Sequence, residues 1–396
     1  MAPLENIEER LRDVQQQVDE LVQQAAGNEP LRRRVLETLE DAAGAVRSPE
    51  ETIWQLVVKP HEYAVLRITL ELGIPLLFLN QAERTAAQLA AETAADGMMI
   101  VAMKFFEEPR PQTYRSSAIT RYLANNERIC STAKFMWDII GKAVLRLPDY
   151  LAKSNYKSPI GKPGAWELAF GEHNFFDTIS KDERLMQQFH DMMAVQRFRR
   201  PEWFDLFPVE EKIIHGFDPS ISDVLLVDIG GSRGHELQKF KRKFPHSPGK
   251  LVLEDLPNVI ALTSGLEADD IVKIGHNFFS KQPVKDARVY YMRSILHDWD
   301  DDKCREILRN IIAAMRKNYS KLLINDWVLP DSGASLYSCL QDINMMTLFS
   351  AMERSEIQMA ELLESVGLTM VHVWGSPRAE RCVEAMLLEP NVDGHN

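Results

Sequence analysis

The sequence predicts an α/β protein in which a helical front part precedes an open, doubly wound sheet. After Gly216, short apolar segments typical of strands alternate with amphipathic segments typical of helices. The first of these strands runs into a glycine-rich turn, DVLLVDIGGSRG at residues 223–234. Before residue 131 the apolar residues recur at helical spacing instead. These three observations predict a helical front domain and a sheet domain at the other end of the chain.

The start of the chain predicts a long amphipathic helix. Its apolar residues recur at spacings of three and four and form one stripe on a surface rich in Glu, Gln and Arg: Leu4, Ile7, Leu11, Val14, Val18 and Leu21. About three heptads are marginal for an independent coiled coil. The stripe therefore packs either across a dimer partner or on its own domain, and packing against a larger body is favoured over an isolated coiled coil.

The next segments predict a winged-helix module. Helical patterns at residues 54–78, 86–93 and 98–106 precede a segment at 113–123 that is typical of a β-wing leading into another helix. In DNA-binding proteins such a module carries basic residues on its recognition helix. Here the formal net charge is −12, which argues against nucleic acid and anionic membranes as partners.

The composition excludes several kinds of site. Hydrophobic residues make up 45% and charged residues 26%, as in ordinary globular proteins. No segment approaches the roughly 20 apolar residues that span a bilayer, and the polar start is unlike a signal peptide. The cysteines are scattered without a CxxC pair, which predicts neither disulfide bonds nor a metal site: Cys130, Cys304, Cys339 and Cys382. We therefore expect a cytoplasmic protein without a metal.

The second half of the chain predicts a Rossmann-like, doubly wound sheet. Helical patterns are found at residues 235–244, 301–316 and 355–366. In such a sheet a ligand binds at the carboxyl ends of the strands. The strands themselves are expected at 224–229, 250–253, 289–294, 322–327, 369–374 and 383–388. Residues 131–215, which are rich in aromatic residues and methionine, are expected to contribute both core and pocket-lining side chains.

The turn after the first strand is a candidate site for a nucleotide-type cofactor. Asp228, Gly230, Ser232 and Gly234 alternate there, and glycine lets the backbone turn sharply and approach a ligand closely. Asp255, at the end of the next strand, is placed to bind the two hydroxyl groups of a ribose. The alternative role for this acid is to cap the helix that follows.

Five successive motifs resemble those of the small-molecule O-methyltransferases of plants and fungi, which are class I S-adenosylmethionine-dependent methyltransferases. They are VDIGGSRGH, LEDLPNVI, HNFFSKQP, YMRSILHDWDDDKC and MERSEIQMAELLESVGL, and the resemblance runs from about residue 30 to the end. It implies S-adenosylmethionine as cofactor, no metal, and a homodimer. It also implies a winged-helix dimerisation domain at 1–130, a helical linker at 131–215 that lines the substrate pocket, and a cofactor-binding catalytic domain at 216–396.

The resemblance further implies which residues bind the cofactor. The glycine turn would lie under its methionine end, Asp255 would hold the ribose, and Asn277 would lie beside the adenine. The sequence departs from the family at two of these places, since Ser232 replaces the middle glycine and Asn277 replaces an acid. The full expected set is Asp228, Gly230, Gly231, Gly234, Asp255, Leu256, Asn277, Phe278, Phe279 and Arg293.

Methylation of a phenol needs a base, because a phenol with a pKa near 10 is a poor nucleophile until it loses its proton. Histidine has a suitable pKa, and a carboxylate on its other nitrogen fixes the tautomer. His297 matches the family's catalytic histidine, and Glu353 and Asp326 are expected beside its ring, although a glutamate is usual in place of Asp326. We interpret Asp298 and the acids at 300–302 as caps of the next helix.

The acceptor pocket is expected to be apolar and suited to a polyketide or an alkaloid-like phenol. The segment at residues 97–106 is several residues shorter than its family counterpart. This shortening is expected to affect both the dimer interface and the substrate pocket. The candidate lining residues, each of which could equally be plain core, are Phe176, Met192, Met193, Asn344, Met345 and Phe349.

Two other functions stay open. A methyltransferase-like scaffold could hold the cofactor unconsumed and catalyse a dehydration or a pericyclic ring closure, as some fungal relatives do. The departures at Ser232, Asn277 and Asp326 motivate this alternative, whereas the presence of His297 and Glu353 opposes it. The other alternative, a winged-helix regulator with a ligand-binding sheet domain, is opposed by the acidic charge.

Overall fold

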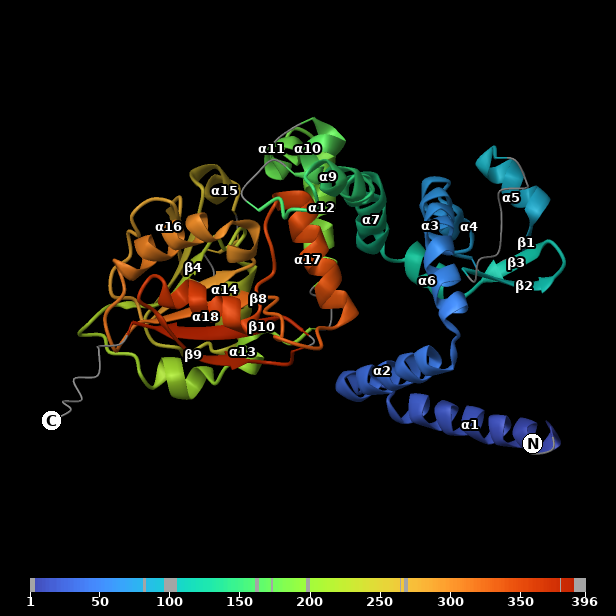
Figure 1. Ribbon diagram of the computed structural model, residues 1–396, viewed down its shortest axis with the longest axis horizontal. Helices are drawn as coiled ribbons and strands as arrows, with labels where there is room; N and C mark the ends of the chain where they lie inside the picture. Colours follow the sequence, from blue (N-terminus) through green and yellow to red (C-terminus); the bar gives the residue numbers. More distant parts are fainter. Residues whose placement is uncertain are drawn as a thin grey trace. The chain divides into compact units, whose positions relative to one another are not determined.

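The computed structural model describes residues 4–80, 83–95, 105–160, 164–171, 174–196, 200–263, 265–266, 270–377 and 379–387. The chain divides into two compact units (Figure 1). The first comprises Met1–Trp137 and Gln187–Arg199, and the second comprises Asp138–Met186 and Arg200–Asn396. The predicted α/β class is confirmed, with a helical front part and a parallel-dominated sheet. The predicted three-part division at residues 130 and 215 stays a prediction.

The first unit is mainly helical. Three of its helices begin at capping boxes, in which each side chain accepts from the other residue's backbone N–H: Ser48 with Glu51, Thr85 with Gln88 and Ser117 with Thr120. The helices are α1 (Leu4–Gln24), α2 (Glu29–Val46), α3 (Pro49–Glu71), α4 (Ile74–Leu77), α5 (Ala86–Thr93), α6 (Ala118–Ala124), α7 (Glu127–Phe135) and, from Gln187 onward, α12 (Glu183–Gln196).

A small antiparallel sheet lies beside α5, in the order β1 (Arg84–Thr85), β3 (Thr113–Ser116), β2 (Phe106–Arg110). Phe106 begins β2, so the helix predicted for 98–106 does not extend to residue 106. Residues 97–104, where the sequence predicts a shortened segment, lie outside the described residues. The predicted wing at 113–123 corresponds to β3 followed by α6, and the winged-helix character of the module stays a prediction.

The predicted apolar stripe of α1 faces outward in this single chain. Leu11 and Val14 are 62% and 54% exposed. Helix α3 likewise exposes Trp54 and Leu56, by 67% and 68%. Of the two alternatives for the stripe, packing on its own domain is therefore not found among the described residues.

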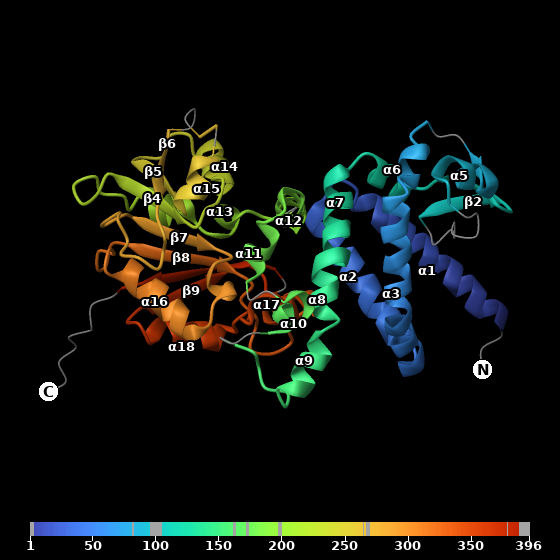
Figure 2. The ribbon, with the colours of Figure 1, turned by 90° about the horizontal axis from the view of Figure 1, so that it is seen from above.

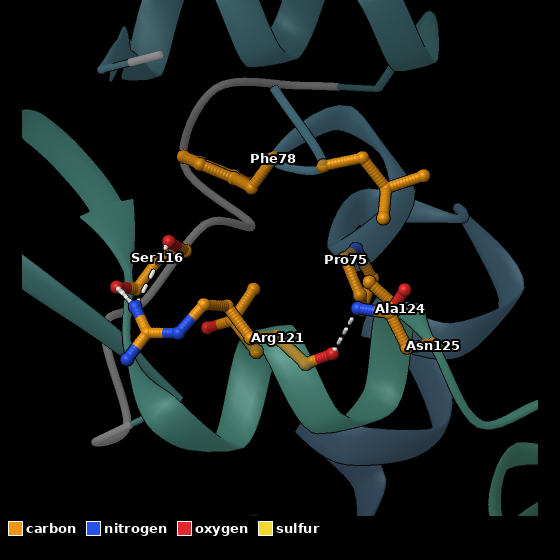
Figure 3. Close-up of a pocket in the computed structure, with 8 residues that line it drawn as sticks. Pro75, Phe78, Ser116, Arg121, Ala124 and Asn125 are labelled. Atoms are coloured by element: carbon orange, nitrogen blue, oxygen red, sulfur yellow. Dashed lines mark hydrogen bonds between the residues drawn. The ribbon is translucent and has the colours of Figure 1, made fainter. Parts of the chain in front are cut away.

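The first unit also contains a small cavity of about 130 Å³ (Figure 3). Its polar side is organised by Arg121, whose Nη1 donates to the carbonyl oxygen of Ser116 at 2.9 Å. The cavity is lined by Pro75, Phe78, Leu79, Ser116, Thr120, Arg121, Ala124 and Asn125. None of the site residues predicted from the sequence is among them.

The second unit is built on a seven-stranded sheet in the order β6-β5-β4-β7-β8-β10-β9. The five strands from β6 to β8 run parallel, and β10 is antiparallel to both β8 and β9. The strand order reverses between β4 and β7, which is where doubly wound folds bind ligands. The strands are β4 (Val224–Ile229), β5 (Lys250–Asp255), β6 (Ile271–Gly275), β7 (Val289–Arg293), β8 (Lys321–Asp326), β9 (Thr369–Trp374) and β10 (Arg381–Met386).

Helices cover both faces of this sheet, as the predicted fold requires. On one face, α16 (Asp301–Ile312) and α18 (Glu356–Glu364) lie next to each other (Figures 1 and 2) and bury Ile307 and Leu363 completely. On the other face, α13 (Trp203–Leu206) and α14 (His235–Lys243) contribute Trp203 and Phe240, whose rings are stacked at 5.7 Å. The sheet strands therefore read as continuous apolar runs rather than alternating ones.

The remaining helices of the second unit are α8 (Lys142–Val144), α9 (Leu147–Lys153), α10 (Ala165–Phe170), α11 (Phe175–Ile179), α15 (Pro257–Ala261) and α17 (Leu336–Phe349). Short π-helical turns occur at Met136–Gly141 and Glu210–Ile214. Within the described ranges, none of the helices combines the length and the apolar character of a membrane span.

Candidate active site

The glycine turn after β4 has no room for side chains at two positions. A Cβ on Gly230 would lie 2.7 Å from Cδ1 of Ile295, and a Cβ on Gly231 would lie 2.4 Å from Oδ2 of Asp228. Both backbone amides donate to the carbonyl oxygen of Glu254, at 2.8 and 3.1 Å. Gly234, with φ of +74°, begins α14 and approaches Leu266 as closely. The turn is thus drawn tightly against β5, while Ser232 and Arg233 on it are exposed.

Ser232 takes a backbone conformation that glycine adopts readily. Its φ is +53°, in the left-handed region that a serine rarely adopts. Its backbone N–H donates to Oδ2 of Asp255 at 2.8 Å, which holds the turn in this conformation. The hydrogen bond to Asp255 therefore stabilises a serine at a position that favours glycine.

Asp255 lies at the end of β5 with both carboxylate oxygens facing backbone amides. Oδ2 accepts from Ser232, and Oδ1 accepts from the N–H of Leu256 at 2.7 Å. Each oxygen has a second lone pair, so the carboxylate can still bind the two hydroxyl groups of a ribose. Burial raises the pKa of Asp255. Leu256, 44% exposed, is itself the N-cap residue of α15, so the alternative cap role of Asp255 is not observed.

These features fit an adenosyl cofactor. The close-packed glycines allow a ligand to approach the backbone, and the acid at the tip of the next strand offers oxygen acceptors beside them. In the described part of the chain, no group of three or more potential ligands could hold a metal ion.

The expected adenine neighbours lie close to the same turn. The ring of Phe278 is 3.8 Å from where a Cβ of Gly230 would stand. Phe279 meets Trp299 edge to face at 4.8 Å. Asn277 accepts from the N–H of Phe279 through Oδ1 at 3.0 Å, so its side chain shapes the turn after β6. Its amide nitrogen and second lone pair are available in principle to a base edge.

The side chain of Arg293 is buried in ion pairs within the protein. Its side chain is 8% exposed and pairs with Glu236 at 3.0 Å and with Glu380. Burial opposes its charge, but the two carboxylates prevail and raise its pKa. The guanidinium therefore joins β7 to α14 and to the loop before β10, and its cofactor role stays a prediction.

His297 lies in a 3-10 turn, η5 (Leu296–Asp298), beyond the carboxyl end of β7. Its Nδ1 is 3.0 Å from Oε1 of Glu353, whose side chain is 1% exposed. An ionised carboxylate only accepts hydrogen bonds, so Nδ1 carries the proton and Nε2 is the basic nitrogen. The sequence prediction of Glu353 as the partner of His297 thus matches the geometry.

The acids around the ring are arranged differently from the sequence interpretation. Oδ1 of Asp326 accepts from the backbone N–H of Ser294 at 2.9 Å, so this carboxylate holds the backbone of the turn and not the imidazole. Asp298, interpreted as a helix cap, lies 3.6 Å from Nε2 of His297. The cap of α16 is Asp300, which accepts from the N–H of Lys303 at 2.9 Å. The cap interpretation of Asp298 was therefore wrong, because the 3-10 turn ends before the helix starts.

The charges of this cluster set its protonation. Burial by itself lowers the pKa of His297, but Glu353, Asp298 and Asp326 together raise it well above its ordinary value. Burial raises the pKa of Asp298 to about 7, and neighbouring carboxylates add to the effect. The surrounding carboxylates therefore favour the cationic form of the imidazole in the free protein.

The acceptor-pocket candidates fall into two groups. Phe176 and Phe349 stack at 5.6 Å, and Phe175 meets Phe349 at 5.1 Å, so α11 and α17 share an aromatic cluster. In α17, Met345 is buried and Asn344 donates to Gln341 at 3.3 Å. Met192 and Met193 lie in the part of α12 that belongs to the first unit, the former buried and the latter half-buried, and their place opposite Phe176 stays a prediction.

Sequence reasoning missed two residues around the base. Asp342 accepts from the backbone N–H of Glu353 at 2.9 Å, and Arg354 donates to the carbonyl oxygens of Leu296 and Trp299. Only the position of Arg354 beside Glu353 in the MERSE motif could have suggested its role, since these contacts join segments more than 50 residues apart in the chain.

A Gly231→Ala variant tests the turn as a cofactor site. The added methyl group would lie 2.4 Å from a carboxylate oxygen of Asp228, so the turn must shift. We expect the affinity for S-adenosylmethionine, measured by titration calorimetry, to fall at least about tenfold, which corresponds to 1.4 kcal/mol. Gly44→Ala is the matched control, because nothing lies within 4 Å of its Cβ position. Equal affinities of the two variants and the wild type would contradict this assignment.

Comparisons with known proteins place this geometry in a family. The model of the O-methyltransferase domain matches residues 157–369. The O-methyltransferase penC of Penicillium thymicola is 32% identical over 90% of this chain and 91% of its own length. The demethylsterigmatocystin 6-O-methyltransferase of Aspergillus flavus is 31% identical over 80% of this chain and 84% of its own. The methyltransferase cfoC of Aspergillus candidus is 39% identical, but the match spans only 62% of this chain and 61% of cfoC.

Solved structures give the same result. The structure of LepI in complex with S-adenosylmethionine has a TM-score of 0.83 and 26% identity, and covers 96% of this chain and 99% of its own. A structure described as a pericyclic reaction enzyme has the same TM-score and coverage at 25% identity. The chain therefore belongs to the O-methyltransferase family of S-adenosylmethionine-dependent enzymes.

Proposed function

We propose that this enzyme methylates a hydroxyl group of an aromatic or polyketide-type secondary metabolite, with His297 as the general base. The observation that carries the proposal is the bond between Nδ1 of His297 and the buried Glu353, which leaves Nε2 as the basic nitrogen. The fungal O-methyltransferases among the relatives support a hydroxyl group of a secondary metabolite as the acceptor. When bound, S-adenosylmethionine would supply the methyl group for an in-line displacement by the acceptor oxygen.

The chain's own residues handle the proton. As the acceptor oxygen forms its new bond, Nε2 takes the hydroxyl proton, and Glu353 stabilises the imidazolium across Nδ1. Asp298, with Oδ1 at 3.6 Å from Nε2, adds to the negative charge that stabilises this imidazolium, and the proton then leaves to solvent. Before each turnover His297 must be neutral, so the acids around the ring limit the fraction of active base at neutral pH.

The remaining predicted residues bind the two ligands in this proposal. Asp228, Gly230, Gly231 and Gly234 form the floor under the methionine end of the cofactor, with Asp255 and Leu256 at the ribose. Phe176 and Phe349, already stacked on each other, offer a flat aromatic surface to a planar acceptor. The other proposed contacts are Asn277, Phe278, Phe279 and Arg293 for the cofactor, and Met192, Met193, Asn344 and Met345 for the acceptor.

A second candidate is a cofactor-retaining dehydratase or pericyclase. The likeness to the pericyclic reaction enzyme over 96% of this chain favours it. The departures at Ser232, Asn277 and Asp326 support it less, because Ser232 adopts a backbone conformation open to glycine and Asn277 keeps hydrogen-bonding groups for a base edge. The paired His297 and Glu353 favour methyl transfer, since a base is what that reaction requires.

Mass balance with a panel of phenolic acceptors tests the first proposal. We expect one S-adenosylhomocysteine for each methylated product, and a decrease in kcat of about 10²- to 10⁴-fold for His297→Gln. His372→Gln, on the exposed edge strand β9, is the matched control and should leave kcat unchanged. A rearranged or dehydrated product formed without loss of S-adenosylmethionine would support the second candidate instead. Full methyl transfer by His297→Gln would exclude this residue as the base.

The pH dependence tests the acid cluster. His297 must lose its proton to act, and its pKa is raised, so kcat/KM should fall as the pH drops through a value well above the ordinary 6.5. Glu353→Gln removes the carboxylate that raises the pKa of His297 most. The fall in kcat/KM should therefore occur at a lower pH, and the maximal kcat/KM should decrease. Glu361→Gln, on the exposed side of α18, should leave the profile unchanged. The same pH dependence of kcat/KM in the wild type and in Glu353→Gln would contradict the role of Glu353.

We also propose that the enzyme is a homodimer formed through its helical front unit. Large apolar side chains stand exposed on α1 and α3, among them Leu11, Trp54 and Leu56. Covering such surface is favourable at about 25 cal/mol per Å². Sedimentation should show a dimer for the wild type and a monomer for Leu56→Glu. Leu262→Glu, which changes a leucine that is 78% exposed in the sheet unit, should stay dimeric. A monomeric wild type at micromolar concentration would exclude the dimer.

A further inference from the structure

We infer that Arg354 is a positioning residue for the base: its guanidinium holds the backbone turn that carries His297, while the neighbouring Glu353 holds the ring. The inference rests on the proposed role of His297. Two adjacent residues between α17 and α18 then set both the orientation and the location of the imidazole.

Arg354 donates hydrogen bonds on both sides of the His297-Asp298 dipeptide. Its Nη1 donates to the carbonyl oxygen of Leu296 at 2.8 Å, and its Nη2 donates to that of Trp299 at 2.9 Å. These are the carbonyls directly before and after the His297-Asp298 pair. Nε and Nη2 also donate to Oδ1 of Asp301, at 3.1 and 2.8 Å, which ties the turn to the start of α16.

The site is built for a guanidinium. The Arg354 side chain is 1% exposed, and its planar donors reach three acceptors at once. A lysine ammonium has the same charge but a single donor nitrogen, so it cannot span the carbonyls of Leu296 and Trp299 in this geometry. The thiol of Cys304 donates to the same carbonyl of Leu296 at 3.2 Å but is uncharged, and it cannot replace the arginine.

Arg354 is itself anchored to the sheet. Its carbonyl oxygen accepts from the N–H of Leu329 at 2.9 Å, and Leu329 in turn accepts from Glu356 at 3.0 Å. Leu329 follows β8, the strand that pairs with β7. The turn of His297 therefore extends from β7 and is held back by a residue anchored beyond β8, which fixes it on both sides.

The position of this turn also affects the pKa of His297, because three carboxylates lie around the ring. The ring is faced by Asp298 on its own turn, by Asp326 at the end of β8 and by Glu353 before α18. Burial raises the pKa of Asp326, and the charges of His297 and Arg354 oppose this rise, so the guanidinium partly offsets the carboxylates gathered around the imidazole. Moving the turn by a fraction of an ångström would change these distances, and with them the protonation of the base.

Arg354→Lys tests the inference, with Arg305→Lys as the matched control. Arg305 also lies beside Asp301 and bonds Asp302 at 2.8 Å, but it does not touch the turn. For Arg354→Lys we expect kcat to fall roughly 10- to 100-fold, as misplacement of a catalytic group does. The affinity for S-adenosylmethionine, per folded molecule, should stay within about twofold. Arg305→Lys should match the wild type in both.

A second measurement does not depend on turnover. The imidazole signals of His297 in ¹³C-histidine-labelled protein, identified by their absence in His297→Gln, give its titration directly. We expect the pKa of His297 to differ between wild type and Arg354→Lys, and not between wild type and Arg305→Lys. This readout stays valid even if the enzyme turns out not to transfer methyl groups, so the two proposals fail separately.

An unaltered His297 titration together with unaltered kcat per folded molecule would overturn the inference and leave Arg354 as a purely structural residue. If Arg354→Lys does not fold, Asp301→Asn replaces it. That variant keeps the two carbonyl contacts but removes the carboxylate that orients the guanidinium. A His297 pKa that differs between this variant and the wild type supports the inference, and an unchanged pKa overturns it.

Discussion

The hydrogen bond between Nδ1 of His297 and Glu353, 3.0 Å long, is the interaction on which the rest of this site depends. It selects the tautomer in which Nε2 is basic, and it lies where water hardly reaches, with the Glu353 side chain 1% exposed. An isolated buried carboxylate would be costly, and removal of one partner of such a pair typically costs about 3–5 kcal/mol. The pairing therefore keeps Nε2 as the basic nitrogen and offsets the cost of burying the Glu353 carboxylate.

The acids beside the ring would repel one another without compensating groups. Two of them accept a hydrogen bond through one oxygen: Oδ1 of Asp326 accepts from the backbone N–H of Ser294, and Oε1 of Glu353 accepts from the imidazole. Asp342 accepts from the backbone N–H of Glu353. Arg354 supplies the nearby permanent cation. Burial by itself lowers the pKa of the His297 imidazole, but the carboxylates around the ring raise it above its ordinary value.

The cofactor turn and the base turn are packed against each other. Ile295, two residues before His297, occupies the space next to Gly230 that a side chain there would need. Ser294, just before it, is held at a φ of +52° by its contacts with Asn325 and Asp326. A strained residue held in place by two hydrogen bonds at such a point is typical of sites that fix reactive groups. The two turns therefore form one rigid wall at the switch point of the sheet.

The sequence by itself determined the fold class, because apolar runs and glycine turns are local signals, and its ordered motifs predicted that Glu353 lies beside His297. Strand β6 was not predicted, since Ile271–Gly275 is only partly buried and lacks a strong apolar pattern. The tertiary structure alone decided that Asp298 faces the ring, that Arg293 is neutralised by Glu236 and Glu380, and that Arg354 clamps the turn. These roles depend on contacts between segments far apart in the chain or on the exact end of a turn, and neither leaves a periodic or local mark in the sequence.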